Sequence, residues 1–315
     1  MKFLKTVIGS FPPKKLALED AIKWAVDIQL KHDIDIISDG EQRADMISYF
    51  NFFPGLGIKP RGPYIKSKVL PLEEPKGFVK LRDLQFVRDY LGSKGREDVV
   101  VKVSVTGPVT LGFSCALNGL EYYSGIGDMK LYYDFARALN PLITEIAKTG
   151  CYLQVDEPSL SAGVMNSKDA VKVVNEALSG LPRAVREEGK LIIHICGAFN
   201  EKMFKDFMSL DAPILSLAFS APNVRKNLEV ISKSALQSGG KRLGVGCVSV
   251  QVAKREDVEK LDMVVRRLRA IMDKIGKEMV AFLHPDCGLR STNEETVEPI
   301  LELLASSARF MEQNE

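Results

Sequence analysis

Short apolar segments alternate with longer amphipathic stretches along most of this chain, and that alternation restricts the folds open to it. The apolar segments are rich in β-branched residues, which is typical of strands buried on both faces. Strands that alternate with helices predict a parallel sheet covered by helices. We expect strands at residues 5–10, 34–39, 99–105, 151–156, 190–196, 214–220, 242–248 and 279–284. Eight repeats in 315 residues favour an α/β fold of the closed (β/α)8 TIM-barrel type, as a single domain over residues 1–315.

The stretches between the strands have helical periodicity and composition. We expect helices at Leu18–His32, 80–91, Met129–Lys148, Lys168–Glu188 and Arg255–Ile275. Residues with reactive side chains follow the apolar part of most strands: Ser10, Asp39, Glu41, Thr106, Asp156, Glu157, His194, Cys196, Asp286 and Cys287. A barrel gathers its active site at these strand ends. A doubly wound open sheet is the alternative, but it would draw its site from fewer strands.

The connection between the second and third strands is longer than one helix requires. Residues 51–78 are dense in Pro and Gly, which argues against regular structure there. We interpret this segment as an elaborated loop inserted in the barrel, and a lid over the barrel mouth is one hypothesis for its role. The aromatic residues before it either line a binding site or pack locally: Tyr49, Phe50, Phe52 and Phe53.

Charge and hydropathy exclude several classes of protein. A net charge of +2 without a basic run gives no electrostatic case for nucleic-acid binding. No apolar stretch is long enough to span a membrane, and the N-terminal apolar segment is too short for a signal peptide. The five cysteines are widely scattered, unlike a disulfide framework. A cytoplasmic location is therefore expected.

One pair of short segments predicts a metal site. His194 and Cys196 lie two residues apart in the apolar run Leu191–Gly197, so a strand would point both side chains to one face. Cys287 ends a second apolar run, Phe282–Gly288. Two thiols and one imidazole are a natural ligand set for Zn²⁺. Three protein ligands leave one position open, which is the pattern of a catalytic zinc.

Neighbouring residues of the same types have a structural interpretation. An isolated cysteine is more often a core residue than a ligand. We therefore assign Cys115, Cys151 and Cys247 to the hydrophobic core. His284 is expected in the core or next to the metal ligands, and a role as a ligand is the alternative. For Asp156 and Glu157 the structural alternative is a helix-capping aspartate beside a solvated glutamate.

Taken together, six motifs resemble the catalytic C-terminal domain of the cobalamin-independent methionine synthase family. They span nearly the whole chain in the family's order: Thr6–Pro12, Ser38–Met46, Thr106–Thr110, Gln154–Ser159, His194–Cys196 and Pro285–Leu289. The larger enzymes of the family carry an additional N-terminal half, so the chain resembles a stand-alone core form. The resemblance implies zinc-dependent transfer of a methyl group to the thiol of homocysteine, which forms methionine. Zinc coordination deprotonates a thiol and so supplies the nucleophile.

The resemblance also implies a role for individual residues. His194, Cys196 and Cys287 match the zinc ligands. Ser10, with the backbone of Ile8 and Gly9, matches the segment that holds the substrate carboxylate. Glu41 and Asp156 match the acidic pair that holds its ammonium, through charge-assisted hydrogen bonds. Asp286 is expected to contact the metal ligands without binding the metal itself.

The chain departs from the family at the metal. Full-length members have a glutamate as fourth ligand, which should fall in Ile214–Ser220, and the matching position is Ala218. No acidic residue lies between Asp211 and Glu229. The resemblance therefore implies three protein ligands and a water, as in related zinc enzymes that alkylate coenzyme M.

Two further departures concern the methyl donor and proton transfer. The family's proton-transfer histidine has no counterpart in Gly244–Ser249. The tryptophan expected after Thr106–Thr110, where folate stacks, is replaced by Phe113 and Ser114, and Trp24 is the only tryptophan. The donor is therefore left open between methyltetrahydrofolate and a methylated corrinoid, free or carried by a corrinoid protein. Two alternatives remain: alkyl transfer to another small thiol such as coenzyme M, and a non-catalytic thiol- or corrinoid-binding homologue.

Overall fold

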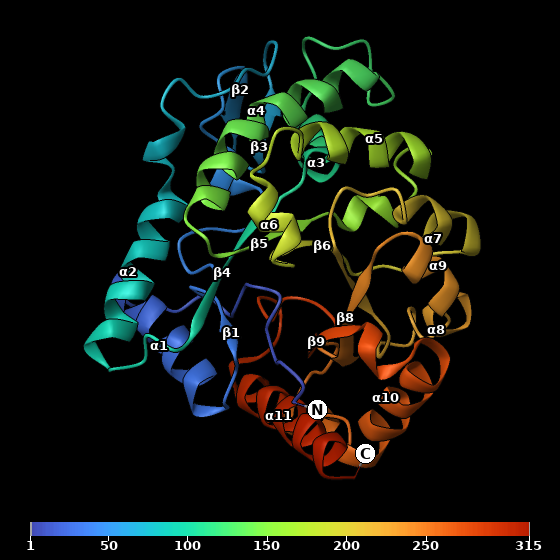
Figure 1. The fold of residues 1–315 in the computed structure, drawn as a ribbon. Coiled ribbons are helices and arrows are strands. Elements are labelled where there is room, and N and C mark those ends of the chain that lie inside the picture. Colours follow the sequence, from blue (N-terminus) through green and yellow to red (C-terminus); the bar gives the residue numbers. More distant parts are fainter. Residues whose placement is uncertain (1, 315) are drawn as a thin grey trace.

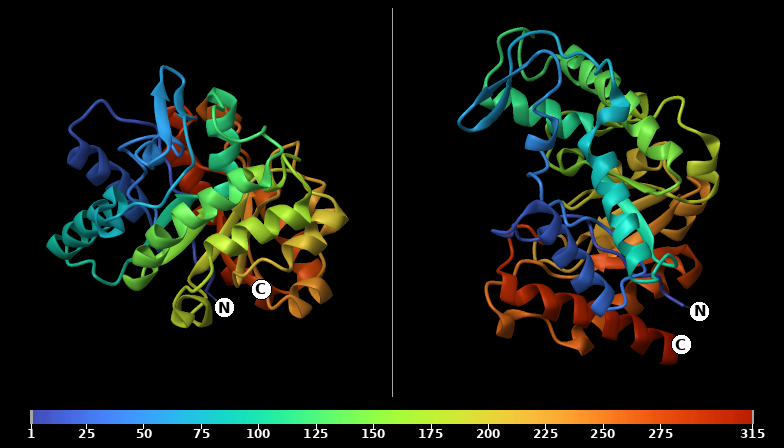
Figure 2. Two further views of the ribbon diagram at one scale, coloured as in Figure 1. Left: turned by 90° about the horizontal axis from the view of Figure 1, so that it is seen from above. Right: turned by 90° about the vertical axis from the view of Figure 1, so that its left-hand side faces the viewer.

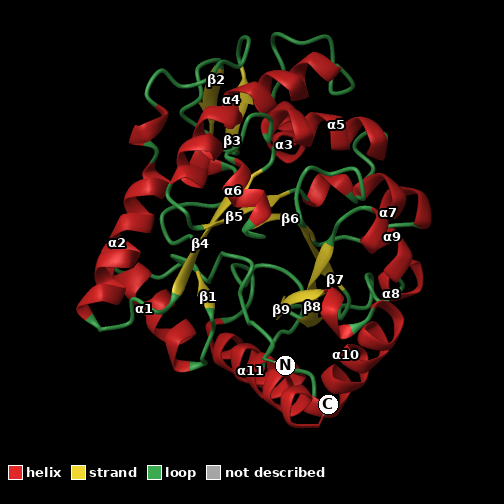
Figure 3. Cartoon of the chain, viewed as in Figure 1, coloured by secondary structure: helices red, strands yellow, loops and turns green. Residues whose placement is uncertain are grey.

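Seven parallel strands curl into a barrel with helices on the outside in the computed structural model, which describes residues 2–314 (Figures 1 and 3). The sheet order is β1-β4-β5-β6-β7-β8-β9, so strands adjacent in the chain are adjacent in the sheet. Their bounds are β1 Ile36–Ile37, β4 Val100–Thr106, β5 Tyr152–Asp156, β6 Leu191–Ile195, β7 Ile214–Ala218, β8 Arg242–Val248 and β9 Val280–Pro285. The predicted TIM-barrel class is confirmed.

The segment predicted as the first strand closes the barrel with two bridges only. Lys5 pairs in parallel with Leu283 of β9, and Thr6 pairs with Ile36 of β1. The expected strand over 5–10 is therefore too long. Its later carbonyls bond to side chains instead of a neighbouring strand: Ile8 O accepts from Gln154 and Ser104, and Gly9 O accepts from Ser38. The predicted second strand is likewise short, with regular pairing only at Ile36–Ile37.

The helices follow the strands as the alternation predicts. Their bounds are α1 Leu18–Lys31, α2 Val79–Ser93, α3 Pro108–Asn118, α4 Met129–Lys148, α5 Ser167–Ala177, α6 Arg183–Glu187, α7 Glu201–Phe207, α8 Asn227–Val230, α9 Lys233–Ser238, α10 Leu261–Ile275 and α11 Glu294–Asn314. The single helix expected over Lys168–Glu188 is wrong. Gly180, with φ +70°, and Pro182 divide it into α5 and α6 because neither continues a right-handed helix. α10 starts at Leu261, later than the expected Arg255.

The Pro/Gly-rich connection contains regular structure, contrary to the prediction. Residues 56–65 form an antiparallel hairpin of β2 (Leu56–Lys59) and β3 (Gly62–Ile65). The positive φ of Gly62, +119°, provides its turn. β3 also bridges to Leu120, so the hairpin lies beside α3 (Figure 1). The sequence pattern missed it because glycine and proline lower strand propensity, and the pairing itself supplies the stability.

Aromatic packing joins the two ends of this connection. Phe50 stacks on Phe53 with ring centroids 6.1 Å apart, and both Phe50 and Phe52 lie 5.6 Å from the ring of Phe78. Phe50, Phe52 and Phe53 contact one another, and the first two contact Phe78, so these contacts correspond to local packing, the second of the two interpretations.

The two ends of the described chain lie side by side in every view (Figures 1 and 2). The amide of Phe3 donates a hydrogen bond to Glu312 in α11, 2.5 Å away. This contact holds the closing segment of the barrel against the last helix. Within residues 2–314, the helices are all too short or too polar to traverse a lipid bilayer.

Candidate metal centre

The register of the sheet places three polar side chains in one row near the carboxyl ends of adjacent strands. Asp156 of β5 is paired with His194 of β6, and His194 is paired with Ser216 of β7. Paired residues of a parallel sheet point to the same face. A carboxylate, an imidazole and a hydroxyl therefore lie side by side.

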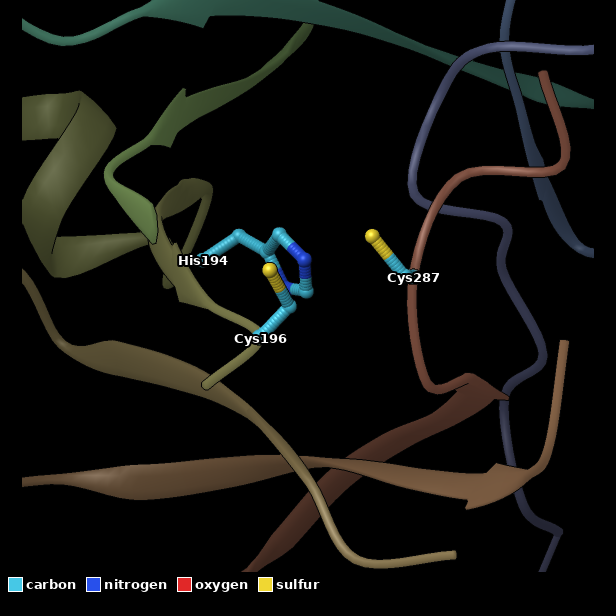
Figure 4. Close-up of side chains that lie close together, drawn as sticks. All are labelled: His194, Cys196 and Cys287. Atoms are coloured by element: carbon cyan, nitrogen blue, oxygen red, sulfur yellow. The ribbon is translucent and has the colours of Figure 1, made fainter. Parts of the chain in front are cut away.

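The three predicted ligands converge. Potential ligand atoms of His194, Cys196 and Cys287 all lie within 4.8 Å of one another, and among residues 2–314 no other group of this kind occurs. Figure 4 shows His194 and Cys196 projecting from the end of β6 toward Cys287, which projects from the loop after β9. His194 is buried and both thiols are half-buried. The partial exposure of the two cysteines leaves the cluster accessible from one side of the protein.

The hydrogen bonding of His194 tests whether these residues fit a metal. Its Nδ1 lies 2.9 Å from Ser216 Oγ, whereas its Nε2 is buried and has no hydrogen-bond partner. An unpaired buried nitrogen costs about 1–3 kcal/mol. Coordination of a cation by Nε2, next to two sulfurs, would remove that cost. The residues present fit zinc.

The two thiols differ in their acidity. A hydrogen bond from Cys196, reinforced by neighbouring His194, holds the pKa of Cys287 well below its usual value. The pKa of Cys196 is raised because its proton is shared with Cys287, and burial adds to that effect. Of the two thiols, Cys287 is therefore the one whose surroundings favour the thiolate, the form that binds metals.

The predicted carboxylate-binding segment lies between the metal ligands and Glu41. A Cβ on Gly9 would lie 3.6 Å from the carboxyl carbon of Glu41. At the other end, a Cβ on Gly288 would lie 2.3 Å from Ser10 Oγ, and the amide of Leu289 donates to Ser10 O at 2.7 Å. Ser10 is thus placed next to the loop of Cys287.

Glu41 has a buried partner that sequence reasoning missed. Its carboxylate accepts a hydrogen bond from Lys80 at 2.7 Å, and the two side chains are only 9% and 3% exposed. Lys80 Nζ also lies 3.8 Å from the ring centre of Tyr49. Glu41 has φ +49°, which non-glycine residues rarely adopt. No signal in the sequence identified Lys80, because a lysine at the start of a helix is usually solvated.

Asp156 lies in a mixed environment of charged and polar groups. Gln154 donates to its carboxylate at 2.6 Å and also contacts the amine of the buried Lys102. Burial raises the pKa of Asp156 to about 7, although nearby His194 opposes the shift. Burial lowers the pKa of Lys102 to about 7. Asp156 is therefore poised to gain from a cationic partner.

Asp286 binds the loop after β7 next to the candidate metal centre. Its buried carboxylate accepts hydrogen bonds from the amides of Phe219, Ser220 and Ala221 at 2.6–3.1 Å. These contacts tie the loop after β7 to the residue before Cys287. Ala218, in the position expected for a fourth ligand, is buried and has no ligand atom in its side chain.

Glu157 is not solvated, so that part of the structural alternative is wrong. It is fully buried and accepts hydrogen bonds from the amides of Val109 and Thr110, at 2.8 and 3.0 Å. Both oxygens lie at the N-terminus of α3, where the unpaired amides of a helix favour a carboxylate. A sequence signal for this helix N-terminus exists in the motif Thr106–Thr110, because Pro108 occupies the first helical position, where proline is favoured.

The remaining cysteines and His284 lie where the sequence placed them. Cys115, Cys151 and Cys247 are buried and free. His284 is fully buried and contacts Ser216, which sequence reasoning did not single out.

Comparisons with known proteins identify the family of this chain. Residues 4–309 match the family model described as the catalytic domain of cobalamin-independent synthase. The chain is 29% identical to the methionine synthase of Methanocaldococcus jannaschii, over 91% of this chain and 86% of that protein. It is 28% identical to the methionine synthase of Methanothermobacter thermautotrophicus, over 91% and 93%.

Solved structures share the fold. A B12-independent methionine synthase from Shewanella sp. W3-18-1, in complex with selenomethionine, aligns with a TM-score of 0.76 at 20% identity, over 99% of this chain and 98% of that one. A methyltransferase from Methanosarcina mazei aligns with a TM-score of 0.61 at 14% identity, over 99% and 94%. With the family model covering nearly the whole chain, the protein belongs to the cobalamin-independent methionine synthase family, as a form of its catalytic domain.

Proposed function

We propose that this protein transfers a methyl group to the thiol of homocysteine and forms methionine, with a zinc ion held by His194, Cys196 and Cys287. The observation that carries the proposal is that potential ligand atoms of these three residues lie within 4.8 Å of one another. In addition, Nε2 of His194 is buried and has no hydrogen-bond partner. When bound, zinc lowers the pKa of the acceptor thiol, so that the thiol reacts as a thiolate.

The chain's own residues would orient the acceptor. Ser10, with the backbone of Ile8 and Gly9, is proposed to hold the carboxylate of homocysteine, and Glu41 and Asp156 its ammonium. Gly9 lies next to Glu41, and Ser10 lies next to the loop of Cys287. An amino acid held by this segment would direct its side-chain sulfur toward the ligand cluster. The bound selenomethionine in the Shewanella methionine synthase supports an amino-acid site in the shared fold.

The reaction balances as a methyl transfer. A bond forms between the acceptor sulfur and the methyl carbon, while the bond from the donor to that carbon breaks and its electrons stay with the donor. The thiol proton is released. The donor is either methyltetrahydrofolate or a methylated corrinoid, and in the second case a corrinoid protein is a possible partner. We take residues 1–315 to act as one catalytic domain.

One observation favours a second acceptor. The buried Lys80 is already paired with Glu41, which leaves that carboxylate less negative charge to offer to an ammonium. A thiol such as coenzyme M, which has a sulfonate and no ammonium, is therefore the alternative substrate. The acidic Asp156 in the same mouth favours homocysteine.

A product assay tests both choices together. Zinc-loaded protein is offered methyltetrahydrofolate or methylcobalamin as donor, each with homocysteine or 2-mercaptoethanesulfonate as acceptor. The proposal expects methionine with at least one donor and little alkylated mercaptoethanesulfonate. Full activity in metal-stripped protein, or product only from the sulfonate, would overturn it. Binding of homocysteine without product from either donor would indicate a non-catalytic homologue.

A further inference from the structure

A chain of hydrogen bonds leads away from His194, on the side opposite the candidate metal. His194 Nδ1 lies 2.9 Å from Ser216 Oγ, and the same oxygen lies 2.9 Å from His284 Nε2. His284 Nδ1 lies 2.7 Å from the carbonyl oxygen of Pro285. All three side chains are at most 2% exposed. Burial shields these bonds from bulk solvent, so the hydrogens are assigned from the contacts themselves.

The direction of these bonds follows from the last one. A carbonyl oxygen only accepts, so His284 Nδ1 must carry a hydrogen. The ring of His284 is fully buried, and its two hydrogen-bond partners are a hydroxyl and a carbonyl, neither of which is an anion. The ring is therefore neutral, and its Nε2 accepts. Ser216 then donates its only hydrogen to His284. Its oxygen is left to accept, and the hydrogen it accepts is the one on His194 Nδ1.

We propose that Ser216 and His284 are positioning residues that hold His194 in the tautomer with its Nε2 lone pair free for the metal. The inference rests on the proposed role of His194 as a ligand. In the other tautomer a hydrogen would occupy Nε2 and prevent coordination. The hydrogen bond from a ligating histidine to an outer partner typically orients the ring and strengthens its binding.

This contact crosses an intervening strand, β8, where two glycines are paired with its partners. β8 lies between β7 and β9 in the sheet, yet Ser216 of β7 reaches His284 of β9. Ser216 is paired with Gly244, and His284 is paired with Gly246. A Cβ on Gly244 would lie 2.2 Å from the ring of Phe282, so a side chain there would displace that ring. The hydrogen-bonded series His194–Ser216–His284, here called the relay, therefore links β6 to β9.

The first experiment reads the tautomers directly. Long-range ¹H–¹⁵N NMR of metal-free wild-type protein is expected to show that the single hydrogen of each neutral ring, His194 and His284, is on Nδ1. A hydrogen on His194 Nε2, or a charged His284, would overturn the proposal. This measurement needs no variant to fold and no activity.

The second experiment measures zinc affinity by competition with a chelator. Ser216→Ala is expected to weaken zinc binding about 10- to 100-fold, the range typical for loss of an outer partner of a metal-binding histidine. Ser307→Ala is the matched control, because Ser307 is an equally buried serine in α11 whose hydroxyl has no hydrogen-bond partner. Its zinc affinity should equal that of wild type. Wild-type affinity in Ser216→Ala would overturn the relay.

Failure of the relay and failure of the proposed function are distinguishable. If wild-type protein binds zinc tightly and forms no methionine, the proposed reaction is wrong, while the affinity ratio still decides the relay. If wild-type protein binds no zinc, the metal site is wrong, and the relay falls with it because it has no ligand to position. If Ser216→Ala does not fold, the NMR measurement of the histidine tautomers in wild-type protein still tests the relay.

Discussion

The two halves of the barrel mouth use different chemistry. The half formed by β6, β7 and β9 carries soft ligands, with two half-buried thiols and an imidazole supported by neutral hydrogen bonds. The half formed by β1, β4 and β5, with α2, carries buried charges of both signs: Glu41, Lys80, Lys102 and Asp156. The comparison teaches that one half, here called the metal-binding half after its candidate ligands, offers soft atoms suited to a metal ion. The other, here called the charged half, holds buried charges that are partly paired with one another.

The largest expected effect comes from removing a sulfur in the metal-binding half. Cys196→Ala should reduce bound zinc from about one ion per chain to a small fraction and abolish methyl transfer, because two ligands hold the ion far less tightly than three. Metal analysis after dialysis and the methionine assay check this. Cys115→Ala, at a buried thiol of α3, is the control and should keep its zinc. A Cys196→Ala protein that retains zinc and activity would refute the division of the mouth.

The next effect should separate the two halves. Asp156→Asn should lower kcat/KM for homocysteine about 10- to 100-fold, because a charge-assisted hydrogen bond to the ammonium contributes about 1.5–3 kcal/mol. Zinc affinity should stay near the wild-type value. Steady-state kinetics and chelator competition measure the two quantities on the same protein. Equal losses in both would show that the halves act as one unit.

The buried ion pair offers a test of stability. Lys80→Met should reduce the free energy of unfolding by about 3–5 kcal/mol, because Glu41 is left buried without its partner. Adding Glu41→Gln to that variant should restore part of the loss. Denaturant unfolding of metal-free protein measures both changes. Lys172→Met is the control, since its exposed pair with Asp169 should contribute less than about 1 kcal/mol. An equal effect at the two lysines would contradict the role given to burial.

A smaller effect concerns pH. The pKa of Asp156 is raised by burial to about 7, so between about pH 4 and pH 7 the folded state binds a proton that the unfolded state releases. The contribution of this group to the free energy of unfolding should therefore fall as pH rises through that window, by about 1–3 kcal/mol in total. Below about pH 4 and above about pH 7, the contribution of Asp156 to the free energy of unfolding should not change with pH.

The pH dependence is checked by comparing wild type with Asp156→Asn, both free of metal. The variant lacks the carboxyl, so its unfolding free energy should change less between pH 4 and pH 7. Parallel curves for the two proteins would show that Asp156 keeps an ordinary pKa. That result would also remove the reason for treating the charged half as ready for a cation.

The sequence predicted the metal-binding half better than the charged half. His194 and Cys196 share one strand, so their common direction follows from a period of two, and Cys287 ends a strand of the same parallel barrel. The structure brings these three residues together as expected. The motif of Glu41 and the segment of Ser10 also lie at this mouth. Lys80 had no such signal, because it enters from α2 and its burial depends on how the helix packs.

Local pattern failed where pairing or side-chain contacts overrode propensity. The hairpin of β2 and β3 forms in a segment rich in proline and glycine, because its two strands satisfy each other's backbone groups. Residues 7–10 leave the ladder because side chains of Ser38, Ser104 and Gln154 bind the carbonyls of Ile8 and Gly9. Neither outcome is encoded in a short window of sequence.

By itself the sequence determined the barrel, the order of its strands and the identity of the candidate ligands, because periodicity and strand-end position are properties of neighbouring residues. Only the tertiary structure decided which groups pair across the mouth. Ser216 joins two histidines 90 residues apart in the chain, and Lys80 reaches Glu41 from a different element. These contacts depend on the register and curvature of the closed sheet, since distances between remote side chains are set by packing and not by spacing along the chain.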